Sequence, residues 1–335
     1  MEKELTILSW PNYIDPLTLE QFEGEFGVRV RVEIVPSAAE LVERMRAAGP
    51  PPDVLVPPDY AVRELSAEER LLALDHERLP NLRHLDPRFR RGRAHDPDSR
   101  VSVIKDWGTT GFMYRLEIVT THLPPKRNGA GSVVQSWADF WRLAEKYSGQ
   151  VTVLDSPGEV IGAALKLRGR SYNAADAEAL AQAREDLLRL KPHVRAFETD
   201  YKPLLASGEA CLSLGWNGDA TALNAAGVRV QYVVPIEGSQ IWEDDWAIAS
   251  GAPHPEAAHA FLNFVLRPEV AAQEARYTRY ATGNRAALAM LDDDIRGDLS
   301  TYPPDGVLQK LEAGMPLDAE GNRRREELWR AVREA

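Results

Sequence analysis

Three tryptophans in separate parts of the chain are each followed by residues that carry carboxylates or amides. The segments are Trp10-Pro11-Asn12-Tyr13, Trp216-Asn217-Gly218-Asp219 and Trp242-Glu243-Asp244-Asp245. The face of an aromatic ring attracts a cation through its quadrupole, and a carboxylate at the ring edge neutralises that cation. This combination favours the binding of an organic amine over catalysis.

The acidic run after Trp242 is the most detailed of these segments. Runs of charge are usually solvated, but this one is flanked by tryptophans and continues into Ala247-Ile248-Ala249, which is typical of a strand. Side chains alternate between the two faces of a strand. We therefore expect Trp242 and Asp244 to line a pocket, while Glu243 and Asp245 stay in water.

Hydrophobic patterns predict the elements that position these residues. A strand over Leu5–Trp10 is followed by a helix that Asp15 caps and Gly27 ends. Residues 28–34 alternate as a half-solvated strand, Ser37 begins the next helix, and residues 53–56 form a short buried strand. This β-α-β-α-β order predicts an α/β fold with a mainly parallel sheet and helices on both faces. Later segments that predict elements are the helix start at Ser136, a strand over 151–154, and helices over 255–266 and 268–280.

Ligands of open α/β sheets bind beyond the carboxyl ends of the strands. The residues that follow predicted strands here are Trp10, Asn12, Tyr13, Asp59, Tyr60, Ser156, Glu159, Trp216 and Asp219, the last two after a strand predicted at Cys211. Such aromatics can also simply plug the edge of a domain. Because several junctions share one chemistry, we favour a shared binding site that also includes Trp242 and Asp244.

The bulk properties limit the function classes. A chain of 335 residues is long enough for two domains, and its net charge of −11 disfavours a nucleic-acid partner. The arginine-rich segment 88–93 is therefore interpreted as a solvated loop. The single Cys211 lies in an apolar run and is expected to be buried. We see no membrane span and no signal peptide, which fits either a cytoplasmic chain or a mature exported form.

Motifs for catalysis are weak. His254 and His259 are five residues apart, which matches no zinc pattern, and no Gly-x-Ser-x-Gly motif occurs. We predict no cofactor, no metal and no catalytic residue. A carbohydrate-active enzyme that uses a pair of carboxylates remains an alternative, because sugar sites also contain tryptophan.

The chain resembles the periplasmic spermidine/putrescine (polyamine)-binding proteins of ABC importers along nearly its whole length. The segments that carry the resemblance are Leu5–Tyr13, Asp53–Tyr60, Trp107–Tyr114, Leu154–Val160, Trp216–Asp219, Trp242–Ile248, Ala260–Pro268 and Tyr280–Ala287. Eight such segments in the family's order are a specific signal. Asn12, Pro58 and Ser156 depart from the family's pattern, so the resemblance leaves open which polyamine is bound.

The resemblance implies a two-lobed periplasmic-binding-protein fold of type II that closes on its ligand like a hinged trap. Lobe 1 would comprise residues 1–114 and 243–284, and lobe 2 residues 115–242 and 285–335, joined by crossover strands. Aromatic residues would sandwich the methylene chain in an interlobe cleft and carboxylates would bind the ammonium groups. The resemblance further implies a monomeric, periplasmic protein that delivers a polyamine to a membrane permease. A protein of the same fold for a different solute is the second alternative.

Overall fold

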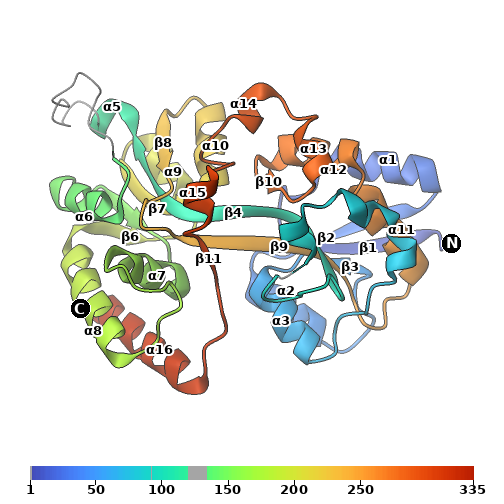
Figure 1. The fold of residues 1–335 in the computed structure, drawn as a ribbon, viewed down its shortest axis with the longest axis horizontal. Helices are drawn as coiled ribbons and strands as arrows, with labels where there is room; N and C mark the ends of the chain where they lie inside the picture. The colour runs from blue at the N-terminus through green and yellow to red at the C-terminus, as the bar shows by residue number, and fades with distance from the viewer. Residues whose placement is uncertain (1, 92, 120–133) are drawn as a thin grey trace. The chain divides into compact units, whose positions relative to one another are not determined.

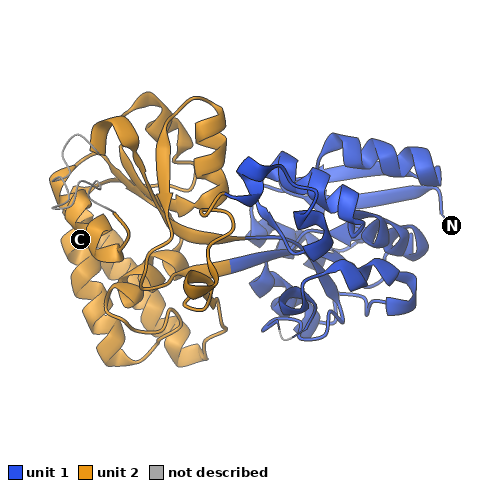
Figure 2. Ribbon diagram, turned by 45° about the horizontal axis from the view of Figure 1, so that its top comes forward, with its two compact units in different colours: residues 1–107, 242–297 blue, residues 108–241, 298–335 orange. Residues whose placement is uncertain are grey.

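The computed structural model describes residues 2–91, 93–119 and 134–335, and the chain divides into two compact units (Figure 2). Unit 1 comprises Met1–Trp107 and Trp242–Gly297, and unit 2 comprises Gly108–Ile241 and Asp298–Ala335. The lobe limits expected from the family resemblance stay a prediction. Units 1 and 2 always have the boundaries that the structure gives.

The boundaries between the units fall inside two long strands, β4 (Ser102–Arg115) and β9 (Gln240–Ile248), so each strand has residues in both units (Figure 1). The other strands of unit 1 are β1 (Glu4–Ser9), β2 (Arg29–Ile34), β3 (Val54–Leu55) and β10 (Ala281–Thr282). Its α-helices are α1 (Pro16–Phe26), α2 (Ala38–Arg46), α3 (Asp59–Ala67), α4 (Pro87–Arg90), α11 (Pro255–Val265), α12 (Pro268–Thr278), α13 (Arg285–Leu288) and α14 (Asp293–Arg296).

The sheet of unit 1 follows the predicted β-α-β-α-β order. Strand β1 pairs in parallel with β2 and with β3, and the second half of β9 pairs antiparallel with β3. Helix α1 begins as predicted, because the Asp15 side chain accepts a hydrogen bond from the Leu17 amide. It ends at Gly27, whose φ of 62° lies in the left-handed region that favours glycine.

Unit 2 contains the remaining elements. Its strands are β5 (Val151–Val153), β6 (Val194–Phe197), β7 (Leu212–Trp216), β8 (Val230–Val233) and β11 (Glu312–Ala313). Its α-helices are α5 (Leu116–Val119), α6 (Trp137–Lys146), α7 (Pro157–Leu167), α8 (Ala177–Leu190), α9 (Lys202–Ser207), α10 (Asn217–Ala225), α15 (Asp305–Leu308) and α16 (Ala319–Glu334). Strand β5 pairs in parallel with β6 and β7, and the second half of β4 runs antiparallel to β7 and β8.

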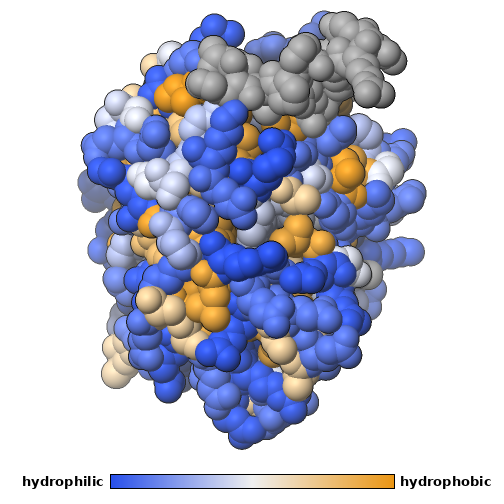
Figure 3. Space-filling view, turned by 90° about the vertical axis from the view of Figure 1, so that its left-hand side faces the viewer, coloured by the Kyte–Doolittle hydropathy of each residue, from blue (hydrophilic) through white to orange (hydrophobic). Residues whose placement is uncertain are grey.

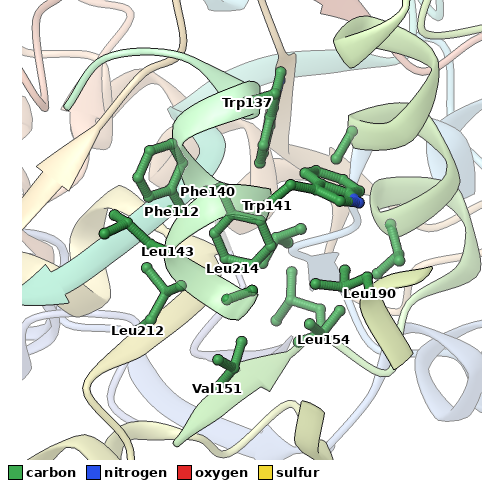
Figure 4. Close-up of a cluster of buried hydrophobic side chains, with 14 of the residues drawn as sticks. Phe112, Trp137, Phe140, Trp141, Leu143, Val151, Leu154, Leu190, Leu212 and Leu214 are labelled. Carbon is green, nitrogen blue, oxygen red and sulfur yellow. The ribbon is translucent and has the colours of Figure 1, made fainter. Parts of the chain in front are cut away.

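The core of unit 2 lies between this sheet and its helices. Aromatic rings of α6 pack on Phe112 of β4, with Trp137 and Phe140 both fully buried (Figure 4). Ser136 and Asp139 form the capping box that starts α6 at the predicted position. Cys211 is buried in the same core, which confirms the prediction from its apolar neighbours. Val151 and Val153 of β5 and Leu212 and Leu214 of β7 belong to the same buried cluster.

The face of the molecule in Figure 3 is mostly polar, as expected from the many charged residues of the chain. Small hydrophobic areas are scattered over this face. Among the described residues, no helix combines the length and the apolar character that crossing a membrane requires.

Candidate functional site

Unit 1 gathers three carboxylates around a single lysine and one tyrosine hydroxyl. Tyr13 follows β1, Lys105 and Asp106 lie on β4, Asp244 lies on β9, and Glu274 lies on α12. The Tyr13 hydroxyl oxygen lies 2.5 Å from Asp106 Oδ1 and 2.7 Å from Asp244 Oδ2. Lys105 Nζ lies 2.8 Å from Asp106 Oδ2 and 3.7 Å from Glu274 Oε2. We call these five residues the Tyr13 group.

The Tyr13 group contains more buried carboxyl groups than its single lysine can neutralise. Burial raises the pKa of Asp244 to about 8, with a further contribution from Asp106, and the hydrogen bond from Tyr13 opposes this shift. Burial also raises the pKa of Glu274, although Lys105 acts in the other direction. Within the described residues, Asp244 forms no ion pair with a cation. The group is therefore short of positive charge.

Aromatic rings line the same group. The Tyr280 ring packs edge-to-face against Tyr13, with centroids 6.2 Å apart, and against Trp242, with centroids 5.0 Å apart. The buried indole Nε1 of Trp242 finds no hydrogen-bond partner within the described part of the chain. Tyr13, Trp242 and Asp244 are thus brought together as an aromatic and acidic group. This arrangement can hold an alkylammonium chemically, because rings and a carboxylate both stabilise a cation.

Asp245, the next residue on β9, is fully buried, so the prediction that it stays in water is wrong. Arg93 Nη1 donates to both of its carboxylate oxygens at 2.6 and 2.7 Å, and the Ser102 hydroxyl donates at 2.6 Å. His95 Nε2 lies 2.8 Å from Asp245 Oδ2. Burial alone would raise the pKa of Asp245, but Arg93 and His95 outweigh it and lower the pKa. We call Arg93, His95, Ser102 and Asp245 the Arg93 group.

Two further expectations for this region are also wrong. Arg93 has no exposed side-chain surface, so the arginine-rich segment is not solvated throughout. Glu243 is only 12% exposed, and burial followed by repulsion from Asp245 raises its pKa to about 7. Ligand atoms of His95, Glu243 and Asp245 lie close enough together for a metal ion. The guanidinium of Arg93 already supplies the positive charge there, so the geometry indicates a structural ion network.

Unit 2 holds a second buried carboxylate beside a tryptophan. Glu159, near the start of α7, accepts hydrogen bonds at 2.6 Å from the Thr110 hydroxyl and from the Trp216 indole. Burial raises the pKa of Glu159, and hydrogen bonds from Thr110, Trp216 and Ser156 oppose the rise. No cation among the described residues forms an ion pair with it. Glu159, Ser156 and Trp216 are therefore brought together, with neutral donors as partners.

Asp219, in the first turn of α10, shows the contrast within the same unit. Its carboxylate accepts a hydrogen bond from the Tyr201 hydroxyl at 2.8 Å and pairs with Lys202 Nζ at 2.6 Å. Its charge is already matched by the chain. Of these two carboxylates, Asp219 has a lysine partner, whereas no described residue forms an ion pair with Glu159.

The remaining predicted site residues lie at the ends of β1 and β3. Trp10 packs against the hydrophobic core of unit 1, and Asn12 is exposed with a left-handed φ of 55°. Asp59 is buried at the start of α3, and burial raises its pKa to about 6. Tyr60 is 51% exposed. The structure therefore places these residues near strand ends, as expected, while their role in binding stays a prediction.

Sequence patterns alone missed Lys105, Asp106, Glu274 and Tyr280 as members or neighbours of the site. A signal existed for Lys105 and Asp106, because they are adjacent opposite charges inside an otherwise buried strand. Glu274 gave no signal, since its contacts with the Asp15 amide and Lys105 join distant segments.

Comparison with known proteins supports the fold described above and identifies the family to which the chain belongs. The family model for bacterial extracellular solute-binding proteins matches residues 18–298. The putrescine-binding periplasmic protein PotF of Escherichia coli is 32% identical, over 99% of this chain and 92% of the relative. The spermidine/putrescine-binding periplasmic protein of Salmonella typhimurium is 32% identical, over 92% of this chain and 85% of the relative.

A solved structure gives the same result for the architecture. The spermidine/putrescine ABC transporter substrate-binding protein PotD of Streptococcus pneumoniae superposes with a TM-score of 0.90 and 26% identity, covering 99% of both chains. The predicted α/β fold with a mainly parallel sheet flanked by helices is confirmed, and so is the resemblance to polyamine-binding proteins. The chain belongs to the family of bacterial extracellular solute-binding proteins.

Proposed function

We propose that this protein is the solute-binding component of an ABC importer and that its ligand is a polyamine with an ammonium group at each end. The observation that carries the proposal is one buried carboxylate in each unit that forms no ion pair with any described residue, Asp244 in unit 1 and Glu159 in unit 2. Each lies beside aromatic residues. A buried carboxylate without a cation is costly, and a ligand ammonium removes that cost.

In this proposal each of the two carboxylates binds an ammonium group. Asp244 does so in unit 1 beside Tyr13 and Trp242, and Glu159 does so in unit 2 beside Trp216. The hydrophobic methylene chain of the ligand packs on the aromatic rings. The names of the relatives support the ligand class, since these proteins are named for putrescine and spermidine.

The cellular role follows from the same support. The relatives are named as periplasmic proteins and the structural neighbour as a substrate-binding protein of an ABC transporter. We propose that this chain works outside the cytoplasm as a monomer, passes its ligand to a membrane permease, and catalyses no reaction. It requires no cofactor, and its acidic charge disfavours nucleic acid as a partner.

Isothermal titration calorimetry with a matched ligand series tests the ligand class. Putrescine, n-butylamine and 4-aminobutyrate share an ammonium followed by three methylene groups, and they end in an aminomethyl, a methyl and a carboxylate group respectively. We expect putrescine to bind tightest, n-butylamine weakly, and 4-aminobutyrate weakest, because its carboxylate would face buried Glu159 or Asp244.

A thermal-shift panel separates the alternatives. A ligand that binds only the folded chain raises the melting temperature by mass action. A response to sugars with none to amines would favour the carbohydrate-active alternative, and a response to 4-aminobutyrate alone would favour a different solute. Closure of the two lobes on the ligand stays a prediction, and solution scattering with and without ligand tests it.

A further inference from the structure

Lys105 places the protein's own ammonium in surroundings suited to a ligand amine. Its side chain is 2% exposed, and Nζ lies 2.8 Å from Asp106 Oδ2. The same Nζ lies 4.1 Å from the centroid of the Tyr13 ring and 5.5 Å from that of Trp246. A carboxylate together with aromatic faces is the chemistry that favours an organic ammonium.

Lys105 therefore divides the carboxylates of the Tyr13 group into two kinds. Asp106 has a lysine partner and also accepts a hydrogen bond from Tyr13. Asp244 has the Tyr13 hydroxyl as its partner and no ion pair within the described residues. Burial disfavours the charged form of Lys105, but Asp106 and Glu274 outweigh this and raise its pKa, so the lysine stays protonated.

We propose that Lys105 is a specificity-determining residue that fills one of two ammonium positions in unit 1, so that this unit accepts one ligand ammonium, at Asp244, and not two. This inference rests on the proposed function, and it concerns the number of ligand ammonium groups that unit 1 accepts. The oxygens of Asp106 and Asp244 both lie within hydrogen-bond distance of one hydroxyl. Two amine nitrogens joined by a short methylene chain fit such neighbouring carboxylates, and the lysine prevents this arrangement.

The first test replaces the cation with a side chain of similar length that carries no charge. Calorimetric titrations compare putrescine and spermidine on the wild type, on Lys105→Met, and on Lys3→Met, which makes the same change in net charge at an exposed position. We expect Lys105→Met to shift the ratio of the two dissociation constants by roughly tenfold or more toward spermidine, because an additional charge pair forms. Lys3→Met should leave the ratio within about threefold of the wild type, since an exposed charge is screened.

A second set of variants keeps the inference testable if Lys105→Met does not fold. In Asp106→Asn, the lysine loses its closest partner and keeps only the more distant Glu274, so we expect it to turn to Asp244 and compete there with the ligand. We expect putrescine to bind roughly tenfold or more weakly, and the double variant Asp106→Asn/Lys105→Met to regain most of that loss because the competitor is gone. If Asp106 instead binds the ligand directly, the double variant stays as weak as Asp106→Asn.

The outcomes separate this inference from the function on which it depends. If the folded wild type binds no amine, the proposed function fails and Lys105 has no specificity role. If the wild type binds putrescine but Lys105→Met keeps the wild-type ratio, only the role of Lys105 is overturned. A double variant no tighter than Asp106→Asn overturns it as well.

Discussion

Asp244 and Asp245 are neighbours on β9, yet their carboxylates lie in opposite electrostatic surroundings. Asp245 contacts Arg93, His95 and Ser102, and these partners lower its pKa. Asp244 receives one hydrogen bond, from Tyr13, and its pKa is raised to about 8. Burial alone therefore does not show whether the chain neutralises a carboxylate.

The difference lies in whether the chain supplies the matching cation. A carboxylate that the protein neutralises contributes to the stability of the fold, as long as its partners remain. A carboxylate that the protein leaves short of positive charge costs stability until a ligand supplies the charge. Glu159 and Asp219 in unit 2 repeat this contrast, because Lys202 pairs with Asp219 and neutral donors surround Glu159.

The largest expected effect is on stability, from Asp245→Asn. This change removes the carboxylate closest to buried Arg93 and leaves only Asp96 and Glu243, each at 3.6 Å. Removing one partner of a buried ion pair costs about 3–5 kcal/mol. Denaturant unfolding measures the loss. Asp293→Asn is the matched control, since Asp293 pairs with Arg296 at the surface and should cost under about 1 kcal/mol. Equal losses for both variants would mean that the Arg93 group does not stabilise the fold.

Asp244→Asn should have the opposite profile, with little loss of stability and a large loss of amine affinity. The amide still accepts a hydrogen bond from Tyr13 but cannot neutralise an ammonium. Truncating one partner of a desolvated charge pair typically costs about 2–5 kcal/mol of binding energy. Calorimetry with putrescine measures this loss, and unfolding of the same sample measures stability. A variant that binds as tightly as the wild type would remove Asp244 from the site.

The pH dependence tests the raised pKa of Asp244 directly. At pH 7 an acid with a pKa of about 8 is largely protonated, so binding of an ammonium releases a proton. We expect putrescine affinity to rise between about pH 6 and 8, by at most about 1.4 kcal/mol per unit, while the amine stays charged. Calorimetry at several pH values measures the slope, which Asp244→Asn should reduce, leaving only the contribution of Glu159, whose pKa is also raised. A flat profile in the wild type would contradict the assignment.

Without ligand, Asp244 should make the stability of the fold fall with rising pH, whereas it makes the affinity for putrescine rise. The folded state holds a proton on Asp244 up to about pH 8, whereas the unfolded chain loses it near pH 3.9. Between these values the folded state binds more protons, so this residue makes stability fall as pH rises. Asp245 has a lowered pKa, so its contribution is present at neutral pH and is lost as the solution is acidified. Unfolding of Asp244→Asn and wild type across this range separates the two contributions.

The smallest expected effect comes from Tyr13→Phe. The change removes the hydroxyl that lies between Asp106 and Asp244 but keeps the ring on which Lys105 packs. We expect amine affinity to fall by about 0.5–1.5 kcal/mol, the usual contribution of one hydrogen bond. Trp emission titrated with putrescine gives the affinity. A loss as large as that of Asp244→Asn would mean that the hydroxyl itself contacts the ligand.

Local patterns were sufficient to predict much of the fold. The Asp15 cap and the Gly27 end of α1 and the Ser136 start of α6 depend on residues a few positions apart. The parallel sheet follows from the order of such elements. Tyr13 and Asp244 were predicted to share a site, but their hydrogen bond was not predicted, because it joins residues 231 positions apart.

By itself, the sequence determined the elements, the α/β class, the family and the aromatic and acidic character of the candidate site residues, because these depend on periodicity, capping and motif order. Only the tertiary structure decided which carboxylates keep an unmatched charge. Arg93 reaches Asp245 across 152 positions, which reverses the expectation that Asp245 is solvated. Lys105 neutralises Asp106 and does not pair with Asp244. Strand alternation predicts the direction of a side chain, but the energy of a charge depends on the partners that folding brings to it.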